Sequence, residues 1–81
     1  MIIYLRFDAV TDVQRRDALT RLQSMLSTEM GLLEQSAQAC IRVETQSDDA
    51  ALVAVNRRLA RIRTELGLKD EQLTCALGPR L

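Results

Sequence analysis

Histidine is absent from the sequence, and the only aromatic residues are Tyr4 and Phe7. The lack of histidine removes the commonest general base and the commonest metal ligand. Two cysteines alone cannot supply, within one chain, the three or four nitrogen and sulfur ligands that a zinc site needs. We therefore expect neither a metal nor another cofactor. With so few rings, the hydrophobic core must be built from aliphatic side chains.

A net charge and a long apolar run are also lacking. Eleven basic residues balance eleven acidic residues, so the net charge is zero. This balance argues against attraction of the whole molecule to nucleic acid or to an anionic membrane. No apolar run approaches the length of about 18 residues that a membrane span needs. The apolar N-terminal stretch is interrupted by Arg6 and Asp8 and has no basic region, so we expect no signal peptide.

Cysteine is scarce, because only Cys40 and Cys75 are present. A small secreted scaffold would normally carry about four or more cysteines in a disulfide framework. We therefore expect two reduced, largely buried thiols and a cytoplasmic protein. A disulfide or a redox pair is the alternative.

The first third of the sequence predicts a strand and then a helix. Residues 1–7 are rich in β-branched and aromatic side chains, and apolar residues on both alternating faces favour a strand interior to its sheet. Thr11 or Asp12 offers an N-cap for a helix that extends to about Glu29. Gly31 suits the position that stops this helix.

The middle of the sequence gives a weaker signal. Residues 39–45 alternate between apolar and polar side chains, which is typical of a half-buried strand. Residues 32–35 could form a short edge strand before it. The connection at residues 36–38 contains no Gly, Asn or Asp, which argues against a tight hairpin and favours an extended loop.

The last third predicts a second helix and a final strand. Residues 47–49 are typical of a helix start, because acidic groups favour the positive end of the helix dipole. Aliphatic residues then recur at three- and four-residue steps, and Gly67 stops the helix. Residues 71–77 alternate as a strand, with Leu73 and Cys75 on one face and Thr74 on the other.

These elements predict one domain spanning residues 1–81. The fold class is an α+β two-layer sandwich, with two helices on one face of a small sheet. If residues 32–35 pair as a strand, the arrangement is a four-stranded split β-α-β, or ferredoxin-like, sheet. If they do not, a three-stranded sheet remains.

No motif of a known catalytic chemistry is present. The sequence has no G-x-S-x-G, no C-x-x-C and no phosphate-binding loop, and its three glycines are dispersed. Cys40, close to Arg42, is the only candidate nucleophile, because an active thiol needs a nearby base or cation. We therefore expect that the protein is not an enzyme, with catalysis by Cys40 as the least favoured alternative.

Two surfaces could bind a partner. The first is a candidate basic patch on the second helix, formed by Arg57, Arg58, Arg61 and Arg63. Helical geometry places Arg57 and Arg61 opposite the apolar stripe, with the other two on either side of it. A solvated helix face with local ion pairs is the plain interpretation, and a phosphate-binding surface is the alternative.

The second surface is the sheet face directed away from the helices. The alternation assigns to it seven candidate partner or dimer residues: Ile2, Tyr4, Arg6, Cys40, Arg42, Glu44 and Thr74. RNA-binding sheets stack bases on two or three aromatic residues, and only Tyr4 is available here. A homodimer would bury this face more naturally, and an ordinary solvated face is the alternative.

The sequence thus favours a small non-enzymatic interaction or regulatory protein, an adaptor or inhibitor of another macromolecule. We expect a homodimer with a further protein partner and no membrane association. The alternative function is nucleic-acid binding through arginines of the helix layer or of the sheet face.

Overall fold

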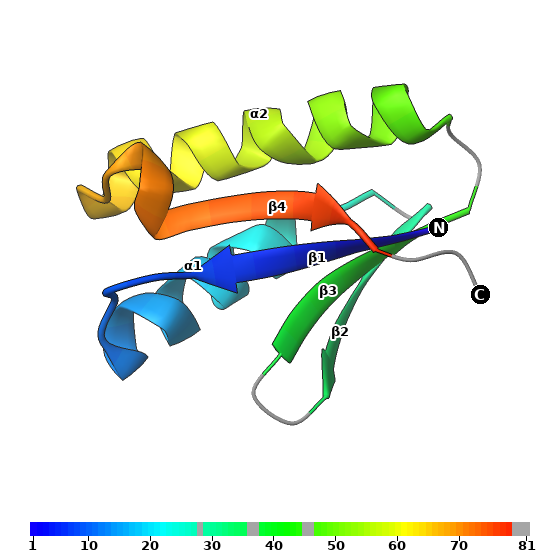
Figure 1. Cartoon of the computed structure of the whole chain (residues 1–81). Helices are drawn as coiled ribbons and strands as arrows, with labels where there is room; N and C mark the ends of the chain where they lie inside the picture. Colours follow the sequence, from blue (N-terminus) through cyan, green and yellow to red (C-terminus); the bar gives the residue numbers. More distant parts are fainter. Residues whose placement is uncertain (28, 36–37, 45–46, 79–81) are drawn as a thin grey trace.

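The computed structural model describes residues 1–27, 29–35, 38–44 and 47–78. Its elements follow in the order β1 (Ile2–Phe7), α1 (Asp12–Met25), β2 (Met30–Gln35), β3 (Gln38–Val43), α2 (Asp48–Leu66), the 3-10 turn η1 (Asp70–Gln72) and β4 (Leu73–Leu77). The four strands form one antiparallel sheet in the order β2-β3-β1-β4 (Figure 1). Strand β3 therefore lies between β1 and β2, and β1 lies between β3 and β4, so each β-α-β unit is split. The predicted two-layer α+β sandwich is confirmed.

Strand β1 lies inside the sheet, as its two apolar faces predict. It pairs with β3 on one side and with β4 on the other. Ile3 and Leu5 are buried on the face that packs against the helices, whereas Tyr4 is half-buried and Arg6 is exposed on the opposite face. The two-residue alternation of the sequence therefore separates a core face from an outer face.

Strand β2 is an edge strand, so the alternative with a strand at residues 32–35 is the correct one, and the strand begins earlier, at Met30. The pairing of β2 with β3 continues to Gln35 opposite Gln38, so Gln38 belongs to β3 rather than to a loop. The rest of the extended loop expected after β2 falls on residues 36–37, which lie outside the part of the chain that the structure describes.

Helix α1 begins as predicted but ends early. Thr11 is the N-cap and forms a capping box, in which Thr11 Oγ1 accepts from the Gln14 backbone and Gln14 Oε1 accepts from the Thr11 backbone. The helix ends at Met25, so the prediction of Gly31 as its stop is wrong: Gly31 lies within β2. Helix α2 supplies the reason, because Arg58 Nε donates to the Met25 carbonyl at 3.0 Å. A tertiary contact thereby satisfies a carbonyl that a longer helix would have bonded.

Helix α2 agrees with its prediction at both ends. Ser47 is the N-cap, and its side chain accepts from the Ala50 backbone. Gly67 has a φ of 68°, in the left-handed region, and Leu68 N donates back to the Arg63 carbonyl at 2.9 Å. This is the glycine-terminated helix end that the sequence predicts.

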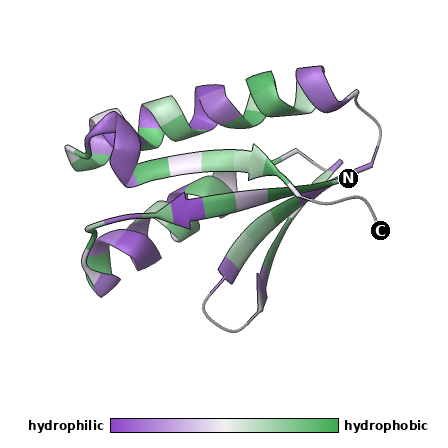
Figure 2. Ribbon diagram, viewed as in Figure 1, coloured by the Kyte–Doolittle hydropathy of each residue, from purple (hydrophilic) through white to green (hydrophobic). Residues whose placement is uncertain are grey.

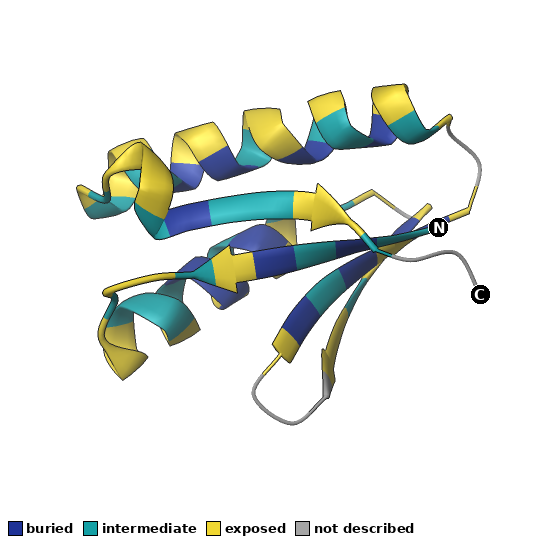
Figure 3. Ribbon diagram, in the orientation of Figure 1, coloured by how far each residue is buried: buried dark blue, intermediate teal, exposed yellow. Residues whose placement is uncertain are grey.

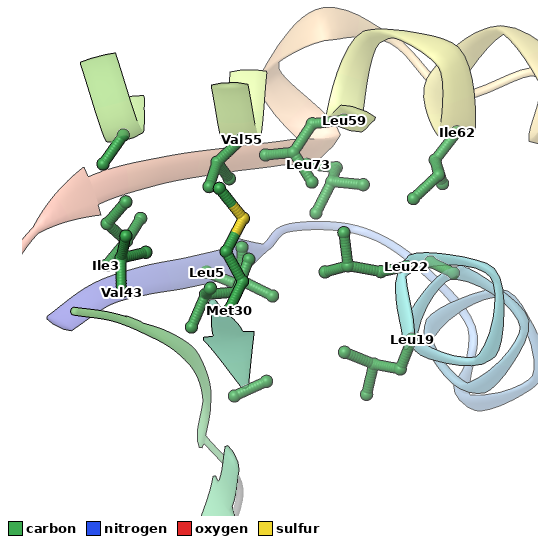
Figure 4. Packing of buried hydrophobic residues seen from close by; sticks show 14 residues of the cluster. Ile3, Leu5, Leu19, Leu22, Met30, Val43, Val55, Leu59, Ile62 and Leu73 are labelled. Atoms are coloured by element: carbon green, nitrogen blue, oxygen red, sulfur yellow. The ribbon is translucent and has the colours of Figure 1, made fainter. Parts of the chain in front are cut away.

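The core lies between the helices and the sheet, and it is aliphatic. Figure 4 shows side chains of α1 and α2 meeting those of the strands, and Figure 3 shows that α2 is buried on the side toward the sheet. Val55, Leu59 and Ile62 of α2 have no exposed surface. Among the described residues, no polar or charged side chain is buried. Hydrophobic burial therefore supplies the main stabilisation.

Candidate functional site

The face of the sheet directed away from the helices carries the residues that the sequence assigned to it. We call it the open sheet face, and it comprises the seven predicted residues together with Leu33 and Ala76. In the register, Ile2 lies opposite Arg42, Tyr4 opposite Cys40, and Arg6 opposite Thr74. Because side chains opposite each other in an antiparallel pair share a face, the structure brings these predicted residues together on one surface.

An apolar row crosses all four strands of this face. Tyr4 lies between Cys40 and Ala76, and Cys40 in turn lies opposite Leu33 on the edge strand. Leu33 is 40% exposed, about as much as Leu77 of β4 at 41%. Figure 2 shows that hydrophobic residues predominate along the strands and that polar residues gather near strand ends. Leu33 was not assigned to this face from the sequence, because its strand was uncertain.

The charges of the open sheet face lie beside the apolar row. Arg42 donates to the carboxylate of Glu44, two residues further along the chain, and both side chains are more than half exposed. Arg6 is exposed on the other side of the row. An exposed ion pair contributes little to the free energy of folding. The pair of Arg42 and Glu44 instead places a positive and a negative charge beside the same apolar row.

Tyr4 is held in place by the close approach of Gly78. The Gly78 N–H donates to the Ile2 carbonyl at 2.9 Å, so the pairing of β4 with β1 continues past Leu77. A Cβ atom at Gly78 would lie only 2.1 Å from Tyr4 Cε2. The tyrosine ring therefore occupies the space that any other residue at this position would need for its side chain.

The two cysteines lie on opposite faces of the sheet and are both free. Cys40 is opposite Tyr4 on the open sheet face, whereas Cys75 is opposite Leu5 on the core side. The thiol of Cys75 lies 3.4 Å from Asn56 Oδ1. Burial raises the pKa of the Cys75 thiol, and the charge of Arg63 offsets part of this effect. The sheet itself thus separates the thiols, which excludes a disulfide between them within one folded chain.

The predicted basic patch is divided by its own contacts. Arg58 donates to the Met25 and Ala54 carbonyls, and Arg63 Nη1 donates to the Leu73 carbonyl at 2.8 Å. These two arginines therefore tie α2 to α1 and to β4. The structure does not bring the four guanidinium groups together on one surface.

The outer surface of the helix layer is also locally neutralised. Glu65 of α2 lies within 3.1 Å of Arg21 of α1 and within 3.3 Å of Arg61. Arg21 pairs in addition with Asp17, and these two acidic partners raise its pKa. Within the described residues, Arg57 makes no ion pair. Most of the positive charge expected on this surface is thus balanced by neighbouring carboxylates.

A groove between α1 and the edge strand β2 was missed by the sequence analysis. Its volume is about 500 Å³, within the range of roughly 300–1,000 Å³ that is typical of ligand pockets. Its lining comprises Asp12, Arg15, Arg16, Leu19, Thr20, Gln23, Leu32 and Glu34. The groove depends on how α1 packs beside β2, and the sequence left the existence of β2 open, so the sequence pattern did not reveal it.

The described residues include no group of three or more His, Cys, Asp or Glu side chains that could hold a metal ion. Among the described residues, no helix combines the length and the apolar composition that crossing a membrane requires. Comparison of the chain with protein-family models, with curated proteins and with solved structures finds no match.

Proposed function

We propose that the chain is a non-enzymatic interaction protein that acts as a homodimer through the open sheet face. The observation that carries this proposal is the apolar row that crosses all four strands, of which Leu33 remains 40% exposed. Contiguous apolar surface on a small soluble domain is characteristic of a protein interface. A second copy offers the same row, so the contact would be isologous.

The geometry of this face favours binding at a low entropic cost. Apart from Glu44, its side chains project from strands rather than from loops, and the ring of Tyr4 packs against the backbone of Gly78. Side chains that are ordered before binding lose little rotamer freedom when they are buried. The open sheet face is therefore preorganised for contact with a flat partner.

Electrostatics are compatible with self-association. The chain has a net charge of zero, so two copies do not repel one another as whole molecules. On the open sheet face, Arg42 and Glu44 supply adjacent charges of opposite sign. A second copy can thus meet the rim of the apolar row with groups of either sign.

We further propose that the dimer binds another macromolecule as an adaptor or inhibitor, in the cytoplasm. The low cysteine content, two cysteines in 81 residues, supports a reducing location, because small secreted domains usually carry a disulfide framework. In the helix layer, Arg21, Arg58, Arg61 and Arg63 are engaged by carboxylates or carbonyls, which supports a protein rather than a nucleic acid as the partner.

The test is the solution mass by sedimentation equilibrium at several protein concentrations, for the wild type and two variants. Leu33→Asp places a charge in the apolar row, and Val53→Asp places one on the outer side of α2, where Val53 is 52% exposed. We expect a dimer for the wild type and for Val53→Asp, and a monomer for Leu33→Asp. Circular dichroism checks that each variant is folded.

A wild-type chain that is monomeric at all concentrations would contradict the proposal, as would a dimer that only Val53→Asp dissociates. The ratio of absorbance at 260 and 280 nm is read on the same samples. Co-purification of nucleic acid that is lost steeply as salt rises would instead favour the nucleic-acid alternative.

A further inference from the structure

The backbone groups of β2 that face away from the sheet can be assigned from the pairing of its neighbour. Val43 exchanges two hydrogen bonds with Met1: Met1 N donates to Val43 O at 2.8 Å, and Val43 N donates to Met1 O at 3.0 Å. Successive residues of a strand direct their backbone N–H and C=O groups to opposite sides of the strand. The backbone groups of Arg42 and Cys40 therefore point toward β2, and those of their partners Gly31 and Leu33 point toward β3.

The remaining residues of β2 consequently direct their N–H and C=O groups outward. These are Met30, Leu32 and Glu34. The N–H of Met30 donates to the Ser27 carbonyl at 3.1 Å. Within the described residues, no hydrogen bond occupies the outward backbone groups of Leu32 or Glu34. An edge strand in this state is a template for a further strand.

The opposite edge of the sheet is formed by β4. The alternation of backbone groups, applied from the bond between Gly78 N and Ile2 O, directs the N–H and C=O groups of Leu73 away from β1. Arg63 Nη1 donates to the Leu73 carbonyl at 2.8 Å. Each edge is thus occupied at its first residue, and the β2 edge is distinguished by the groove that borders it.

The side chains of Leu32 and Glu34, whose backbones are open, also line the groove between α1 and β2. Leu19 and Leu32 supply apolar surface, and Arg15 and Arg16 lie along the helix side of the groove. The groove therefore combines backbone groups for strand pairing with a place for side chains. This combination of an edge strand and a flanking helix is how several domains bind extended peptides.

Arg16 is the group of the groove that a carboxylate on a ligand would contact. Four charged side chains line the groove, Asp12, Arg15, Arg16 and Glu34, so the lining as a whole is neutral. Arg15 Nη1 pairs with Glu34 Oε1 at 3.3 Å, and its guanidinium also lies 5.5 Å from the centre of the Phe7 ring. Arg16 is exposed and, among the described residues, takes part in no ion pair. A carboxylate on the ligand can therefore pair with Arg16 without displacing an existing contact.

We propose that the groove between α1 and β2 binds an extended peptide segment of a protein partner as a fifth strand. The peptide pairs with the backbone of Leu32 and Glu34, places apolar side chains at alternate positions toward Leu19, and presents an Asp or Glu to Arg16. A second copy of β2 fits less well, because its own acidic residue, Glu34, is already paired with Arg15. This surface is separate from the open sheet face, so the proposal does not depend on the dimer.

The test uses a panel of fluorescein-labelled seven-residue peptides with one fixed Asp and with Val, Leu, Ile, Phe or Tyr at alternate positions. Affinity is measured by fluorescence anisotropy, and the amides of Leu32 and Glu34 are followed by hydrogen exchange and ¹⁵N NMR. We expect the peptides that bind to protect both amides. An N-methylated peptide, which cannot pair as a strand, and an Asp-to-Asn peptide are the controls on the ligand side.

Charge reversal tests the groove from the protein side. Arg16→Glu should weaken binding by roughly five- to tenfold, because an attractive contact at the rim becomes repulsive. The matched control Arg57→Glu, an exposed arginine of α2, should bind as the wild type does. Three results would each overturn the proposal: no binding by any panel member at millimolar concentration, equal binding of the N-methylated peptide, or protection of the two amides by higher protein concentration alone.

Discussion

At the scale of single residues, the two glycines that the sequence presents as helix stops have opposite roles. Gly67 lies in the left-handed region at the end of α2, where it is the only glycine with a positive φ among the described residues. Gly31 lies in β2, and nothing lies within 4 Å of the place where its Cβ would be. The same residue type is thus required at one position and replaceable at the other.

These roles predict different effects of alanine. Gly67→Ala should lower the free energy of unfolding by about 1 kcal/mol, because a β-carbon is strained at a positive φ. Gly31→Ala should leave it unchanged or raise it by up to about 1 kcal/mol, because glycine weakens a strand interior. Urea denaturation monitored by circular dichroism measures both. A comparable loss of stability at Gly31 would contradict the position of this residue within β2.

At the scale of elements, the end of α1 depends on a side chain of another helix. Arg58 should therefore matter for stability although it is a charged residue on a helix surface. Arg58→Met keeps most of the apolar stem but loses the bonds to the Met25 and Ala54 carbonyls. We expect a loss of about 1–2 kcal/mol in the free energy of unfolding. Arg57→Met, one residue earlier and exposed, should change it by less than about 0.5 kcal/mol, and equal effects of the two would refute this role of Arg58.

The elements also show which parts of the fold are predictable from the sequence. Strand β1, the start of α1 and both ends of α2 are correct because alternation, capping and a left-handed glycine act within a few residues. The predicted end of α1 was wrong because Arg58, a residue of another helix, bonds the Met25 carbonyl at this end. The strand at residues 32–35 was left open because its pairing with β3 is not a local property of the sequence.

The same distinction applies to the candidate surfaces. The strand residues of the open sheet face were assigned to the correct face of the sheet, because successive side chains of any strand point to opposite faces. Leu33 and the groove were missed because both require knowing that β2 exists and where it pairs. Helical geometry had already separated the arginines of the basic patch, because it placed Arg58 and Arg63 on either side of the apolar stripe. The Met25 and Leu73 carbonyls that engage these two arginines could not be predicted, since both lie outside α2.

At the scale of the whole molecule, 81 residues enclose one aliphatic core, and a domain of this size has a small margin of stability. If the proposed dimer forms, each copy gains stability from its partner by mass action. The melting temperature of the wild type should then rise by roughly a few °C for each tenfold increase in protein concentration. Differential scanning calorimetry measures this dependence. Leu33→Asp should melt at a temperature independent of concentration, and the same slope for both proteins would count against dimerisation through this face.

The two edges of the sheet determine how many partners strand pairing can recruit. A sheet with two receptive edges can add copies or ligands at both ends, and such growth has no natural limit. A peptide in the groove beside β2 fills one of these edges and leaves only β4 for further growth. There the guanidinium of Arg63 occupies the Leu73 carbonyl, so an incoming strand has to displace it before the full length of β4 can pair.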